Sequence, residues 1–297
     1  MKPSKAERAG RVLVALGKSV CYLALFMGVQ VLVMLPTLVA AGVQSAMGNW
    51  EMADQLERMV FENLTLFSAL SGLFTIGVVL LFYLARHKTL GDSLWLRRVE
   101  GPGLLSGAAL APALYLAVTL VLMALPEAWM ESYAEASSSV SSGDLVSIIA
   151  VVLVAPVVEE FIFRGLMMTR LAQAMPGWLA AALSAAIFGV CHGHPVWFAY
   201  TFVLGLAFGL MDLRLGSIWP SILAHMAFNA IGQVFSILTE DDAVVAALGV
   251  LALAGLVVPI LCRKEVAALF RPAPGAAASA GELPAEPERY EYDPWDE

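Results

Sequence analysis

Three charged side chains lie close together in a long apolar segment of the chain. The segment from Leu145 to Met168 carries Glu159, Glu160 and Arg164 near its second half. Each charge near mid-bilayer costs roughly 2.5–3.5 kcal/mol on insertion scales, so three within a turn and a half require a reason. On a helix Glu160 and Arg164 are i,i+4 neighbours that can pair, whereas Glu159 has no basic partner on its own face. We therefore expect Glu160 to be charge-compensated and Glu159 to be the better proton acceptor.

Two further apolar segments carry polar groups at helical spacing. Phe188 and His192 are four residues apart, and so are His225 and Asn229. Both pairs therefore lie on one face of their helix. A spare carboxylate, two imidazoles and a carboxamide are the groups needed to activate water and to stabilise an oxyanion. The pattern indicates hydrolytic chemistry inside a membrane.

Each of these groups also has a purely structural interpretation. Glu160 and Arg164 taken alone form the kind of buried ion pair that any intramembrane charge requires. His225 and Asn229 can serve as an interhelical hydrogen-bonding pair. Structural roles are also the simpler interpretation of Cys191 and His194. Free cysteines are usually small, buried packing residues, and turns such as the one that contains His194 commonly hold polar residues.

Composition indicates a polytopic membrane protein. The chain has 297 residues, of which 60% are hydrophobic and 14% charged, and its mean hydropathy is +0.78. Soluble domains are about 45–50% apolar and about 25% charged. The net charge of −8 is not typical of a protein that binds nucleic acid. The three cysteines do not form a disulfide framework. The first apolar run is too long for a cleaved leader, so we expect it to be the first span.

The predicted fold is an all-α bundle of about eight transmembrane helices around an intramembrane polar cavity. Most of the apolar segments are near the length of about 20 residues that a spanning helix needs, but the fifth and sixth are shorter. The eight segments are Val20–Val43, Leu64–Ala85, Leu104–Leu125, Leu145–Met168, Trp178–Cys191, Val196–Met211, Ile218–Leu238 and Ala243–Cys262.

Loop charges predict the topology. Basic residues precede the first span and follow the second, fourth, sixth and eighth, whereas the intervening loops are acidic. The positive-inside rule therefore predicts cytoplasmic termini. We expect a basic N-terminus over residues 1–19, one membrane domain over 20–262 with its core at 145–238, and a cytoplasmic tail over 263–297. The tail is rich in Pro, Ala and Glu from Arg271 onward, which predicts disorder.

The motifs EEFIFR, FGVCH and HMAFN resemble, in this order, the three motifs of the CPBP family of membrane proteases. That family groups CAAX prenyl endopeptidases with bacteriocin-processing and immunity proteases. The resemblance covers about Val151 to Gly232. It implies an intramembrane endopeptidase with a cavity open to the cytoplasm, that is, a hydrolase of the type of a CAAX-protease-like membrane metalloendopeptidase.

The resemblance also implies roles for individual residues. Glu159 would be the general base that activates water, with His192 assisting it. His225 and Asn229 would stabilise the tetrahedral oxyanion.

Glu160 and Arg164 would brace this arrangement. In the alternative mechanism Glu159, His192 and His225 bind Zn²⁺, since carboxylates and imidazoles are normal zinc ligands. The chain has no His-Glu-x-x-His helix, so spacing alone does not establish a zinc site.

The implied partners are a peptide or protein substrate at the membrane and the lipid bilayer, with no nucleic acid. We expect an integral protein of the bacterial inner membrane. Two other functions remain open at this level. One is a non-catalytic immunity or scaffold protein that binds a peptide in the same cavity, and the other is a proton-coupled transporter with a Glu/His relay.

Overall fold

The computed structural model describes residues 4–87, 89, 93–99, 101–138, 144–236, 241–261, 263 and 264. Helices make up nearly all of this part of the chain, and no strand occurs in it, so the predicted all-α class is confirmed. The predicted disorder of the tail from Arg271 lies outside the described residues. The helices are α1 (Lys5–Ala46), α2 (Trp50–Glu62), α3 (Leu64–Ala85), α5 (Gly101–Met123), α6 (Glu127–Ser138), α7 (Leu145–Ile149), η1 (Ala150–Val154), α8 (Ala155–Glu160), η2 (Phe161–Met168), α9 (Thr169–Ala172), α10 (Gly177–Val190), α11 (Pro195–Leu215), α12 (Trp219–Ser236) and α13 (Asp241–Leu261).

Each of the eight predicted apolar segments is helical over most of its described residues. Five of them are long and apolar enough to cross a membrane, namely those that contain Ala6–Ala46, Leu64–Ala85, Gly103–Met123, Leu145–Ala172 and Pro195–Leu215. The number of eight spans remains a prediction, because the other three helices do not meet both conditions among the described residues.

The two segments that the sequence predicts to be short differ in the structure. α10 has 14 residues, so at about 1.5 Å per residue it is only some 21 Å long. The prediction that the sixth segment is short is wrong, because the helix that contains it, α11, has 21 residues. Asp212 and Arg214 end the apolar run of α11 but not its helix, which continues to Gly216 in the left-handed conformation.

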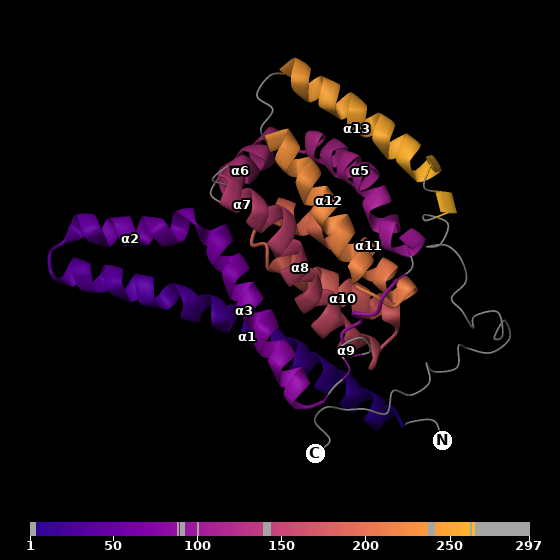
Figure 1. The fold of residues 1–297 in the computed structure, drawn as a ribbon, viewed down its shortest axis with the longest axis horizontal. Coiled ribbons are helices and arrows are strands. Elements are labelled where there is room, and N and C mark those ends of the chain that lie inside the picture. The colour runs from indigo at the N-terminus through magenta and orange to yellow at the C-terminus, as the bar shows by residue number, and fades with distance from the viewer. Residues whose placement is uncertain are drawn as a thin grey trace.

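Two segments predicted as acidic loops are helical. α2 presents Asp54 and Arg58 at i,i+4 spacing, where they form an exposed ion pair, and it buries Ala53 and Val60. α6 is the second such helix. α1 and α2 form a hairpin that projects from the other helices (Figure 1). α1 alone has 42 residues, about 63 Å, and so exceeds the roughly 30 Å of a hydrocarbon core.

The helix that carries the three charged residues changes its winding twice. A π-helical turn, η1, precedes α8, and a second π-helical segment, η2, follows it directly after Glu160. Pro156 in the first turn of α8 has no N–H to donate. π-helical turns inside α-helices are rare and occur mostly at functional sites. Every residue of η2 is buried, so this segment forms the centre of the bundle.

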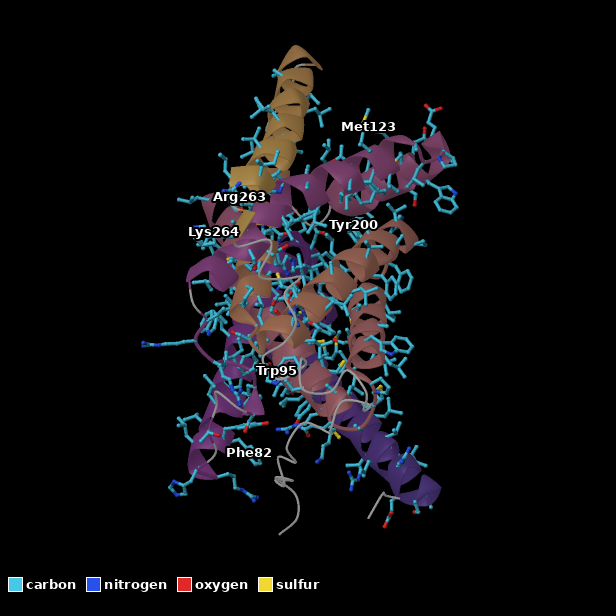
Figure 2. All side chains as sticks on the ribbon, turned by 90° about the vertical axis from the view of Figure 1, so that its right-hand side faces the viewer. Phe82, Trp95, Met123, Tyr200, Arg263 and Lys264 are labelled. Carbon is cyan, nitrogen blue, oxygen red and sulfur yellow. The ribbon has the colours of Figure 1, made fainter. Side chains whose placement is uncertain are left out.

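The segment between α3 and α5 fixes the start of α12. Trp95 accepts a hydrogen bond from the Ile218 backbone N–H at 3.0 Å, and Ser217 donates its hydroxyl to Arg97 O at 2.8 Å. Leu94 is fully buried beside them. Phe82 and Met123, near the C-terminal ends of α3 and α5, lie toward opposite ends of the molecule (Figure 2). α12 packs against α8, where the site lies.

Candidate active site

His225 on α12 joins the two adjacent glutamates of α8. Its Nδ1 lies 2.9 Å from Glu160 Oε1, and its Nε2 lies 3.6 Å from Glu159 Oε2. The Glu160 side chain is fully buried and that of His225 is 10% exposed, whereas Glu159 is 26% exposed. Glu159 has a basic neighbour from another helix, His225 on α12. Packing of α12 against α8 supplies an imidazole that helical spacing cannot reveal.

The hydrogen bond to Glu160 fixes which nitrogen of His225 carries a proton. A carboxylate only accepts, so Nδ1 must be the donor. In neutral His225 the Nε2 atom that faces Glu159 then has a free lone pair, and in the imidazolium it has an N–H. The distance of 3.6 Å to Glu159 is too long for a direct hydrogen bond but allows one water molecule to contact both atoms. The reactive edge of the site lies between these two side chains.

Arg164 has the role that the sequence predicts, as the local partner of Glu160. Its Nε lies 3.2 Å from Glu160 Oε2, at ion-pair distance but without the alignment of a hydrogen bond, and both side chains are fully buried. The guanidinium also lies over the ring of Phe188, 4.6 Å from its centroid. A cation over an aromatic face is stabilised electrostatically, more so when both are desolvated.

Phe188 connects the groups of the site. Its ring contacts Phe163, His192 and His225, with centroid separations of 5.0, 4.7 and 6.1 Å. The Nδ1 atom of His192 donates to Phe188 O at 2.8 Å, since a carbonyl only accepts. Neutral His192 thus also keeps a free lone pair on Nε2. His192 lies beside the Phe188 ring, and the described contacts do not join it directly to either glutamate.

Asn229 makes an interhelical hydrogen bond. Its Nδ2 donates to Val151 O, in the π-helical turn η1, at 2.9 Å. This contact matches the structural interpretation of Asn229, and it leaves one N–H of the amide for other use. His194 has a structural role, because its Nδ1 accepts the Val196 N–H at 3.2 Å and caps α11. Cys191 is a half-buried free cysteine.

Three residues that the sequence did not single out complete the surroundings of the ion pair. Gly205 lies against Arg164, because a Cβ at that position would come within 2.8 Å of its Nη2. Asp212 and Ser221 face Glu160 from α11 and α12, and both are fully buried. The sequence did contain a signal for Asp212, because an acidic residue in a membrane-spanning segment often marks a functional site. The sequence does not show, however, which way its side chain points.

The donor chemistry of the site fits a zinc ion. Glu159, His192 and His225 supply a carboxylate and two imidazole Nε2 atoms, and each imidazole is oriented by a hydrogen bond from its Nδ1, as is usual for zinc-binding histidines. Within the described part of the chain, however, no three His, Cys, Asp or Glu side chains are grouped closely enough to hold a metal ion. The zinc site therefore remains a prediction.

Comparisons with known proteins agree with the motifs. Residues 141–231 match the Rce1-like family, described as type II CAAX prenyl endopeptidase Rce1-like. The chain is also 30% identical over 77 residues to a Bacillus subtilis (strain 168) protein named putative membrane peptidase YdiL. That match covers 26% of this chain and 32% of the relative, so the chain spans about a third of the length of the curated relative it matches. No solved structure matches the chain. The family resemblance predicted from the three motifs is confirmed over this region.

Proposed function

We propose that this integral membrane protein is a peptidase that hydrolyses peptide bonds at the contact between Glu159 and His225. The observation that carries the proposal is the bridging position of His225, 2.9 Å from the buried Glu160 and 3.6 Å from the partly exposed Glu159. One carboxylate orients the imidazole, and the other is accessible to water and substrate. The family match and the named relative support the reaction class.

In this proposal Glu159 is the general base. It takes a proton from a water molecule held between its carboxylate and His225, and the resulting hydroxide attacks the carbonyl carbon of the peptide bond. Glu159 then passes the proton to the leaving amine. His192, fixed by its bond to Phe188 O, assists from the neighbouring helix.

The charge on His225 distinguishes two ways to stabilise the oxyanion. Because Nδ1 donates to Glu160, neutral His225 has no N–H left for an oxyanion, whereas the imidazolium donates from Nε2. The remaining N–H of Asn229 would be the second donor. If Zn²⁺ is held by Glu159, His192 and His225, it supplies the positive charge and polarises the water.

A comparison of peptide termini tests the proposal and does not require a known substrate. Membranes of cells that express the wild type or Glu159→Gln are compared by mass spectrometry of peptide termini. We expect at least one terminus that is abundant with the wild type and absent with Glu159→Gln and with His225→Ala. The matched control is Glu57→Gln, the same change on the exposed face of α2, which should resemble the wild type. Identical termini in the wild type and Glu159→Gln would contradict the proposal.

A further inference from the structure

A cavity of about 340 Å³ lies between α5, α11 and α12. α5 packs against both of the other helices (Figure 1). The volume is within the range of about 300–1,000 Å³ that is usual for small-molecule sites. Among the described residues that line the cavity, Arg214 has the only polar side chain, and the other side chains are apolar, for example those of Leu110, Leu114 and Met211.

The cavity is separate from the candidate active site. Neither Glu159 nor His225 lines it, although the ring of Phe208, which does, lies 5.7 Å from that of His225 between centroids. On the side of α12, a Cβ at Gly107 would come within 2.4 Å of a backbone oxygen, so α5 and α12 are in direct contact there. Leu210 lines the cavity and is 44% exposed, so the cavity reaches the surface of the spanning helices.

Positive charge gathers at one end of the cavity. Arg214 lies in the last turn of the spanning helix α11. Ser217, three residues later, donates to Arg97 O at 2.8 Å and so fixes the segment with Arg97 and Arg98 at the same end. The side chains of Arg97 and Arg98 are exposed. An arginine at the end of a spanning helix reaches the level of the lipid head groups, and its planar guanidinium suits phosphate.

The chemistry of the lining favours an acyl chain over a peptide. An extended peptide has N–H and C=O groups in every residue, and the apolar side chains of the cavity cannot pair with them. Unpaired backbone groups are costly in an apolar environment. An acyl chain has no polar group along its length, and in a phospholipid it ends at a charged head group, as the cavity ends at Arg214.

We propose that this cavity binds one acyl chain of an anionic phospholipid, with the lipid phosphate at Arg214. Basic pockets between spanning helices are typical binding sites of anionic lipid head groups. The inference goes beyond the proposed function and does not depend on it, because lipid binding is measurable whether or not the protein cleaves peptides.

Native mass spectrometry of the purified full chain in detergent tests the role of the charge. Phosphatidylglycerol and phosphatidylcholine with identical acyl chains are the probes, and the wild type should bind phosphatidylglycerol more tightly. Arg214→Gln should bind it about fivefold more weakly, in keeping with the contribution of one basic residue to anionic-lipid binding. The matched control is Arg86→Gln, the same change at the end of α3, which should bind like the wild type. Equal binding of the two lipids by the wild type, or equal affinities of the wild type and Arg214→Gln, would overturn the proposal.

Phosphatidylglycerol with a photoactivatable group on one acyl chain locates the chain itself. On irradiation it should cross-link to the wild type within residues 110–114 of α5 or 207–211 of α11. Ala207→Phe, which fills the cavity, should lower this yield several-fold. Ala199→Phe, the same change at an exposed position of α11 outside the cavity, should not.

The cross-link in the wild type needs no variant, so it decides the question even if Ala207→Phe does not fold. Excess glycerol phosphate has the head-group phosphate without the chain and should not compete. Cross-links confined to other helices, or full competition by glycerol phosphate, would overturn the proposal.

Discussion

Replacing Glu160 with Gln should destabilise the protein far more than the same change at Glu159. Glu160 and Arg164 are both fully buried, and Gln retains the size of Glu but removes the charge that faces the guanidinium. Arg164 Nη1 and Nη2 already lack hydrogen-bond partners among the described residues. Removal of one partner from a buried ion pair costs about 3–5 kcal/mol, because the other charge remains buried without compensation.

Glu159→Gln is the matched control, since it is the same substitution one residue earlier on the same helix. The Glu159 side chain is 26% exposed, and its closest ionic contact is 3.6 Å long. We therefore expect a change in stability of less than about 1 kcal/mol, as for partly exposed ion pairs. Glu159→Gln should instead abolish catalysis, because Gln at position 159 cannot accept the proton of water.

Thermal unfolding in one detergent and cleavage of a substrate found in the terminus comparison measure both effects on the same preparations. A loss of 3–5 kcal/mol lowers the melting temperature by on the order of 10 °C for domains of this size class. We expect Glu160→Gln to melt lower by about this amount, and Glu159→Gln to melt like the wild type and be inactive. A stable but inactive Glu160→Gln together with an active Glu159→Gln would refute the reasoning and make Glu160 the base.

Three further predictions concern the surroundings of the site, its metal and the topology. Gly205→Ala should displace the guanidinium of Arg164, because its Nη2 would lie 2.8 Å from the new Cβ. We expect this change to destabilise the protein by about 1–3 kcal/mol in a denaturation assay. Gly77→Ala is the control and should not destabilise the protein, because the space around its Cβ is open. Chelators should stop cleavage and added Zn²⁺ should restore it, a prediction that elemental analysis of active, metal-free protein would contradict. A reporter fused after Glu297 should be active in the cytoplasm, and activity confined to the external side would reverse the topology.

The sequence alone predicts the features of the site that depend on local geometry. The i,i+4 spacing of Glu160 and Arg164 brings their charges together on any helix, and the structure confirms the pair at 3.2 Å. The same rule places His192 beside Phe188. Hydrophobic run length predicts the helices because a segment that is apolar throughout must bury its backbone polar groups in helical hydrogen bonds.

Helix ends and loop helices are harder to predict from hydropathy. α11 continues through Asp212 and Arg214, since a charged side chain ends an apolar run without breaking the backbone hydrogen bonds of the helix. α2 is helical although its composition is mixed and acidic, because it buries one narrow face that contains Ala53 and Val60. Hydropathy alone therefore predicts neither the C-terminal end of α11 nor the helical conformation of α2.

Only the tertiary structure shows how the groups of the site meet. His225 is 65 residues from Glu160, and no local rule indicates that its ring faces both glutamates. The burial of Asp212 also depends on packing, because the sequence does not show whether its face of α11 points out of the bundle or into it. Helical spacing determines which side chains share a face, but only the packing of α8, α11 and α12 determines which faces meet.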